Sequence, residues 1–423
     1  MIRKGALLLL LAALVLPARV AAQEQPIRIV SEQLENRFPI ELLFHIEAES
    51  QAADITRIKL FYRLRGSESE TQVPMEFASG RRVQASYRWY TEYLTIPPGA
   101  PVLYRWEIRD AAGNVLNSEE RTFYYDDVRF EWRTRSDESL TVFWYAGGDA
   151  FGEALYEKAR TSLSALEDGL QARLDFPIRV VVYGSDEDFR SAFPRMNDWV
   201  GGRAFPAMGL TVQTIAPGDQ EYLSRVIPHE IAHLLFFQLT DNPYVSPPSW
   251  LDEGLAVYSE SPSNPVYDLL VTTAAADGTL LPMEFIVGGF PADYERALLA
   301  YAQSYSLVKF LIERYGEERL GAYLQAFKRA GIRFDEQRAF QEAFGVPFEE
   351  FLEAWRADVG LRGTPVIPTA VPTRTPATPP VSPTTPPTEE QRRVALPCLG
   401  LGLVLASAAF WWWRRGGTGG AAV

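Results

Sequence analysis

At 423 residues the chain is long enough for two or three domains, and its 47% hydrophobic and 13% aromatic content can fill real cores, which excludes a disordered protein. Its formal net charge is −13 and no run of lysines or arginines interrupts the acidic balance, so we expect no nucleic-acid partner. The single cysteine, Cys398, excludes an intramolecular disulfide.

The first residues have the pattern of a secretory signal peptide. Arg3 and Lys4 precede an apolar run from Ala6 to Leu16, and Val20-Ala21-Ala22 forms a small-residue cleavage site. The apolar run is too short to cross a bilayer. We therefore predict that residues 1–22 are a cleaved signal peptide and that the rest of the chain is exported.

Residues 26–127 are predicted to form an all-β sandwich domain. Four stretches are rich in β-branched and aromatic residues and are separated by turns that contain glycine or proline. The predicted strands are residues 40–49, 55–65, 83–90 and 102–110. Their spacing is typical of immunoglobulin-like or fibronectin-like sandwiches. Fold alone assigns no role, so a spacer or packing platform and a ligand-binding module both stay open.

A second domain, residues 130–360, is predicted to be α+β because its strands come first and its helices follow. Apolar residues from Phe151 to Leu170 recur every three to four positions, which predicts a helix, and Ser185 opens another. The predicted strands are residues 129–134, 140–145, 178–183 and 207–215. Further helices are predicted at residues 294–315, 318–330, 334–344 and 347–359, the first ending at Gly316.

The chain ends in three segments that follow these domains. Residues 363–390 are mainly proline and threonine and are predicted to form an extended, disordered stalk. Residues 394–413 are apolar over about 30 Å of helix, long enough for a transmembrane helix, and residues 414–423 form a short tail. Because the signal peptide is exported first, we predict a single-pass cell-membrane protein whose folded domains are extracytoplasmic.

One short motif, His229-Glu230-Ile231-Ala232-His233, contains two of the three histidines in the chain. On a helix, residues four apart lie on one face about 5–6 Å apart at Cβ, close enough to bind one cation. Glu230 points about 100° away around the helix and can hold a water beside the metal. Because proline is tolerated in a first helical turn or at a kink, Pro228 predicts that His229 lies near the start of its helix.

The two histidines need a third ligand from elsewhere in the chain. A metzincin-type site requires glycine at position 236 and histidine at position 239, and Phe236 and Leu239 exclude it. The downstream motif Trp250-Leu251-Asp252-Glu253-Gly254-Leu255-Ala256 offers two carboxylates, Asp252 and Glu253. Two imidazole nitrogens and one carboxylate suit Zn²⁺ with an open coordination position, the pattern of catalytic sites.

Together the two motifs resemble those of the gluzincin metallopeptidases. They are most similar to the peptidase-MA-like group and, more distantly, to the aminopeptidase N family with its H-E-x-x-H and W-L-N-E-G-F-A motifs. The resemblance covers roughly residues 130–358. It implies a gluzincin-like α+β fold, a Zn²⁺ cofactor held by His229, His233 and Glu253, and Glu230 as the general base.

The resemblance also implies a tyrosine that stabilises the oxyanion and stands about fifteen residues before a glycine. Tyr301, followed by Gly316, is similar in register, and Tyr305, one turn further, is the alternative. On an amphipathic helix either side chain can instead serve packing. Each imidazole ligand also needs an acceptor for its second nitrogen, and Asp252 and Glu260 are the candidates.

The segment that reads the substrate's amino terminus in the aminopeptidase relatives differs here. Those relatives have G-x-M-E-N, whereas Pro206-Ala207-Met208-Gly209-Leu210 lacks the Glu-Asn pair. We therefore predict an endopeptidase, with an extended peptide pairing to the strand at residues 209–214. The predicted function is a membrane-tethered, extracytoplasmic zinc peptidase that acts on peptides or proteins. The alternative is a non-catalytic surface binding protein with a metallopeptidase-like scaffold.

Overall fold

The computed structural model describes residues 26–360, apart from residues 93, 95, 194–201, 262 and 292. Four predicted segments lie outside the described residues: the signal peptide 1–22, the stalk 363–390, the transmembrane helix 394–413 and the tail 414–423. Among the helices of the described part, none combines the length and the hydropathy needed to span a membrane.

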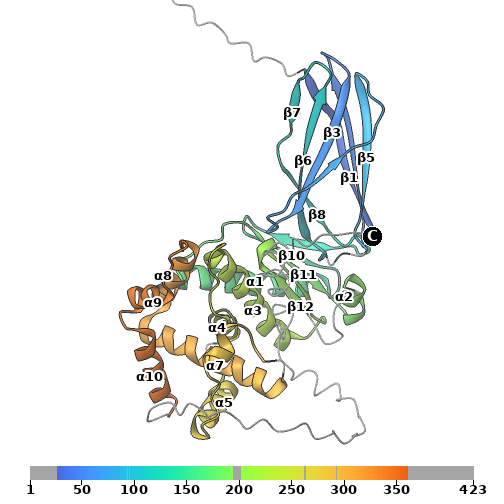
Figure 1. Cartoon of the computed structure of the whole chain (residues 1–423). Helices are drawn as coiled ribbons and strands as arrows, with labels where there is room; N and C mark the ends of the chain where they lie inside the picture. Colours follow the sequence, from blue (N-terminus) through green and yellow to red (C-terminus); the bar gives the residue numbers. More distant parts are fainter. Residues whose placement is uncertain are drawn as a thin grey trace, which may run out of the picture.

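The first part of the chain folds into two antiparallel β-sheets that enclose one core (Figure 1). One sheet has the order β1-β2-β5, and the other has the order β4-β3-β6-β7, with β8 also paired to β6. The strands are β1 (Ile27–Arg37), β2 (Glu41–Ser50), β3 (Ile55–Leu64), β4 (Thr71–Pro74), β5 (Arg82–Tyr90), β6 (Ala100–Asp110), β7 (Val115–Asn117) and β8 (Arg121–Tyr125). The four predicted strands correspond to β2, β3, β5 and β6, and the other four are additional.

Side chains alternate between core and surface along the strands of this sandwich. In β2, Leu42, Phe44 and Ile46 are fully buried, and they share one core with Val102 and Trp106 of β6 in the opposite sheet. Such period-two burial follows from the pleat of a strand, which points successive side chains to opposite faces. The apolar alternation is therefore what holds the two sheets together.

The second part of the chain contains a five-stranded mixed sheet of order β12-β13-β11-β10-β9. The three central strands β10, β11 and β13 are parallel, and β9 and β12 run antiparallel to their neighbours at the two edges. The strands are β9 (Arg133–Ser136), β10 (Leu140–Trp144), β11 (Ile178–Tyr183), β12 (Gly202–Phe205) and β13 (Leu210–Thr214).

Helices α1 and α3 cover one face of this sheet, and their apolar side chains form a core with β10 and β11. The later helices form a separate core around α7, whose observed and predicted bounds agree and which ends where Gly316 takes a φ of 89°. The helices are α1 (Gly148–Gly169), α2 (Asp186–Ala192), α3 (Gln220–Thr240), α4 (Ser249–Glu260), α5 (Pro265–Ala276), α6 (Glu284–Val287), α7 (Tyr294–Tyr315), α8 (Glu317–Lys328), α9 (Glu336–Phe344) and α10 (Phe348–Asp358).

Two predicted strands of the second part begin later than expected. The strand predicted at residues 129–134 starts only at Arg133, because Arg129 and Trp132 instead bond to the side chain and carbonyl of Asp127. The strand predicted from residue 207 starts at Leu210, because Pro206–Met208 forms a 3-10 turn that ends at Gly209 with a φ of 64°. Both corrections come from side-chain and turn geometry that apolar patterning does not register.

The sandwich packs directly on the other face of the mixed sheet (Figure 1). Tyr183 of β11 donates its hydroxyl to Asp127 over 2.8 Å, and Arg179 donates to Asp126 over 2.6 Å. Val181 and Val212 belong to the same apolar core as the sandwich strands. The two parts therefore share buried surface and are joined by more than the connecting chain.

Candidate metal centre

Helix α3 carries both histidines of the motif, and it begins well before them. Asp219 caps its first turn by accepting a hydrogen bond from the backbone N–H of Tyr222. Pro228 lies inside the helix, so the prediction that His229 stands near the helix start is wrong. Proline lacks the N–H that would bond one turn back, yet the apolar residues of α3 are buried on several sides, and this packing sustains the helix.

Helix α4 supplies the carboxylates, and a close approach to α7 fixes its position. A Cβ on Gly254 would lie 2.4 Å from the carbonyl oxygen of Ser304 and 2.6 Å from Val308 Cγ2, both in α7. Glycine is therefore needed at this position for the two helices to touch. The neighbouring Glu253 consequently points from α4 toward α3.

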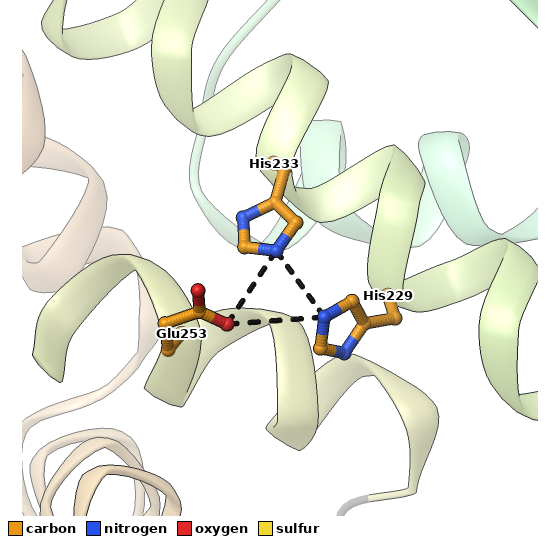
Figure 2. A group of neighbouring side chains, drawn as sticks. All are labelled: His229, His233 and Glu253. Atoms are coloured by element: carbon orange, nitrogen blue, oxygen red, sulfur yellow. Dashed lines mark hydrogen bonds and ion pairs between the residues drawn. The ribbon is translucent and has the colours of Figure 1, made fainter. Parts of the chain in front are cut away.

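The side chains of His229, His233 and Glu253 converge on one point between α3 and α4 (Figure 2). The two Nε2 atoms lie 3.2 Å apart, and Glu253 Oε2 lies 3.6 Å from His233 Nε2 and 3.9 Å from His229 Nε2. All three residues are buried. Ligand atoms around a tetrahedral ion with bonds of about 2.0–2.1 Å lie roughly 3.3 Å apart, so these separations fit a zinc-sized ion.

Each imidazole is held at its other nitrogen by a carboxylate. His229 Nδ1 lies 2.8 Å from Glu260 Oε1, and His233 Nδ1 lies 2.7 Å from Asp252 Oδ1. A carboxylate only accepts, so we assign the proton to Nδ1 in both rings, which leaves Nε2 to face the common point. The other oxygen of Glu260 lies 3.5 Å from Arg225 Nε, one turn before His229 on α3.

The carboxylates next to His233 make the point between the three side chains favourable for a positive charge. Burial lowers the pKa of His233, but Asp252 and Glu253 outweigh it and raise the pKa to about 10. Burial also raises the pKa of Glu253, against the opposing effect of His233 and His229. The carboxylates around His233 therefore favour a positive charge at this point, which a bound metal ion would supply.

Two buried carboxylate oxygens complete the fit to a metal and a water. Within the described part of the chain, Glu253 Oε2 and Glu230 Oε1 have no hydrogen-bond partner. Buried polar atoms are normally satisfied, so atoms left open mark a place for a ligand. Two nitrogens and one oxygen form the donor set of a catalytic zinc site with one position open. The residues present therefore fit Zn²⁺.

Glu230 stands beside this group and is almost fully buried. Its Oε2 lies 3.4 Å from the hydroxyl of Thr211 in β13, a neighbour that the sequence analysis did not indicate. The sequence of β13, in which Thr211 and Gln213 alternate with Leu210 and Val212, reads as a strand with one polar face and gives no sign of this contact. Both polar side chains are fully buried in the structure, and buried polar groups normally have hydrogen-bond partners.

The two candidate tyrosines both lie on α7 and are buried. Tyr305 accepts a hydrogen bond from the backbone N–H of Asn264 over 2.9 Å and packs against Tyr267, which ties it to the start of α5. Tyr301 packs edge-on against Phe290. The Asn264 contact gives Tyr305 a structural role, and the oxyanion role of Tyr301 stays a prediction.

Replacing Gly254 with alanine should destabilise the protein by about 1–3 kcal/mol, the usual cost of overpacking. The added methyl group would collide with the backbone of α7, which cannot move aside as a side chain can. Thermal unfolding measures the change. Gly331→Ala is the control, because nothing lies within 4 Å of a Cβ there. Equal melting temperatures for the two variants would contradict the close contact between α4 and α7.

Residues 158–360 match the family model described as Peptidase MA superfamily. The predicted family resemblance is confirmed over this part of the chain. The match contains α3 and α4 and so covers every residue of the candidate metal centre. No curated protein sequence matches the chain.

Solved structures of metallopeptidases are similar to parts of the chain. An M1 zinc metallopeptidase from Deinococcus radiodurans aligns over 77% of this chain and 92% of its own, with 16% identity and a TM-score of 0.34. An aminopeptidase N family protein from Idiomarina loihiensis aligns over 74% of this chain and 73% of its own, with 10% identity and a TM-score of 0.37. At this level of similarity the alignments assign no role to any residue of this chain.

Proposed function

We propose that the chain is a zinc-dependent peptidase that hydrolyses internal peptide bonds. The observation that carries the proposal is the convergence of His229, His233 and Glu253, with Glu230 beside them and one of its oxygens open. The match of residues 158–360 to the Peptidase MA superfamily model supports a peptide as the substrate. Zinc is favoured because two imidazoles and a carboxylate match its ligand preference.

In the proposed hydrolysis, each residue of the site has a separate role. His229, His233 and Glu253 would hold the zinc ion, which when bound acts as a Lewis acid and lowers the pKa of water in its open position. Glu230 would take the proton from the attacking water and return it to the leaving amine. Glu260 and Asp252 hold the two imidazoles in orientation. Tyr301 is the proposed donor to the oxyanion.

We propose that an extended peptide binds at the edge of the mixed sheet, on a different strand from the one predicted. Strand β13 lies between β11 and β12, so both of its hydrogen-bonding edges are occupied, and the prediction that it pairs with substrate is wrong. Among the described strands of the mixed sheet, β12 is the outermost on the β13 side, and we propose that an extended peptide pairs along it. The missing Glu-Asn pair after Met208 supports cleavage at internal bonds.

We also propose that the peptidase is tethered to the outer surface of a cell membrane. The support is the order of sequence features, a signal pattern at residues 1–22, the stalk 363–390 and the apolar segment 394–413. Fractionation of cells that express the full chain tests this proposal. A full chain found in the soluble cytoplasmic fraction would overturn it.

Metal analysis and cleavage mapping test the function together. The purified full chain should contain about one zinc ion, cleave a peptide library at internal bonds, stop after chelation and recover on addition of Zn²⁺. Release of amino-terminal residues only would show an aminopeptidase instead. Zinc without any turnover would favour a non-catalytic binding protein, and a chain without affinity for zinc would overturn the metal centre itself.

A further inference from the structure

Two fully buried polar side chains, Thr211 and Gln213, lie behind Glu230 on strand β13. They stand two residues apart and therefore point to the same face of the sheet, the one covered by α3. Burying a hydroxyl and an amide is costly unless each is hydrogen-bonded. Thr211 and Gln213 therefore need hydrogen bonds in this buried position.

The contacts form a short chain that ends at Glu230. Gln213 Nε2 donates to Thr211 Oγ1 over 2.7 Å. Thr211 Oγ1 in turn lies 3.4 Å from Glu230 Oε2 and 3.3 Å from the carbonyl oxygen of Arg203. A threonine hydroxyl has one proton, so it serves one of these two acceptors at a time. The proposed general base acts as a carboxylate, which accepts a hydrogen bond more strongly than a backbone carbonyl, so Glu230 is the favoured acceptor under the proposed function.

The edge strand β12 makes room for this arrangement. Gly202 pairs with Gln213, and Ala204 pairs with Thr211. A Cβ on Gly202 would lie 1.6 Å from Gln213 Oε1, so the amide occupies the space that any larger residue would fill. The small residues of β12 thus let the polar side chains of β13 lie flat between the sheet and α3.

We propose that Thr211, oriented by Gln213, is a positioning residue for the general base. Its hydroxyl binds Glu230 Oε2, which leaves Oε1 as the oxygen that faces the water and accepts its proton. Oε1 is the oxygen without a partner among the described residues. The distance of 3.4 Å is long for such a bond, and hydrogen bonds in unliganded catalytic sites commonly shorten when substrate is bound. The inference rests on the proposed peptidase function.

Three threonine variants of the zinc-loaded full chain test this role. Thr211→Val removes the hydroxyl at nearly constant shape and should lower kcat by about 10- to 100-fold with KM and zinc content unchanged, the usual effect of losing a residue that orients a ligand or base. Thr211→Ser keeps the hydroxyl and should restore most of the rate. Thr240→Val is the control, because Thr240 is also buried and its hydroxyl donates to the carbonyl of Phe236 within α3, its one side-chain hydrogen bond among the described residues.

Crystal structures of the zinc-loaded wild type and Thr211→Val provide a readout independent of turnover. The Glu230 carboxylate should keep one orientation in the wild type and lose it in the variant, while the two histidines stay in place. An unchanged kcat in Thr211→Val, or a serine variant as slow as the valine variant, overturns the positioning role. If the wild type binds zinc but cleaves no peptide, the proposed peptidase function is wrong. If the Glu230 carboxylate has the same orientation in the wild type and in Thr211→Val, the positioning role of Thr211 is wrong, whatever the activity.

Discussion

Replacing Glu230 with glutamine should lower the rate of peptide hydrolysis by about 100- to 10,000-fold while zinc stays bound, the range typical for loss of a general base. Glutamine has nearly the same shape but cannot take a proton from water. The ligand atoms of His229, His233 and Glu253 are untouched by the change, so metal analysis should still find about one zinc ion. The measurement is kcat on a cleaved peptide together with the zinc content.

A matched control separates this effect from general damage to the fold. Glu167 is also a buried glutamate, but it accepts a hydrogen bond from the backbone N–H of Leu174, away from the metal centre. Glu167→Gln should therefore keep its activity apart from any change in stability. A Glu230→Gln enzyme with more than a tenth of the wild-type rate would show that another group accepts the proton.

Replacing Glu253 with glutamine should weaken zinc binding by more than about 100-fold, because partners that merely hydrogen-bond to a ligand already contribute about 10- to 100-fold. The metal-free protein should not lose stability, since a neutral amide replaces a carboxylate whose pKa burial raises. Zinc at a hundred times the dissociation constant of the wild type would stabilise the wild type by about 2.7 kcal/mol. The variant should gain almost none of this.

Thermal unfolding with and without zinc measures this difference. Glu317→Gln is the control, because burial also raises the pKa of Glu317 but the residue lies at the start of α8, outside the cluster. That variant should keep the full zinc-induced shift in melting temperature. A Glu253→Gln variant with the same shift would mean that Glu253 does not bind the metal.

The two histidines of the candidate metal centre could be predicted from local chemistry alone. Two histidines four apart on a helix share a face whatever the rest of the fold does. The third ligand, Glu253 in α4, could be named only through the family resemblance. The structure adds the reason for the glycine: Gly254 lets α4 touch α7 and so presents Glu253 to α3.

The features that were missed depend on contacts between distant segments. Pro228 reads as a helix start by its own preference, but the apolar residues that surround α3 keep the helix intact through it. Strand β13 is recognisable from its sequence, but only the pairing with β12 shows that it lies inside the sheet. The approach of Thr211 to Glu230 likewise joins a strand to a helix 19 residues later, and no spacing rule links them.

The apolar core that the sandwich shares with the mixed sheet lets the sandwich support that sheet from one face. Tyr183 and Val212 lie on the face that the sandwich covers, while Thr211, next along β13, points to Glu230 on the opposite face. The sandwich thus supports, from the opposite face, the strand that orients the base. We expect the two parts to unfold in a single cooperative transition. Separating the two parts near residue 128 would expose the apolar residues of their shared core and loosen β13, so we expect residues 129–360 to be less stable without the sandwich.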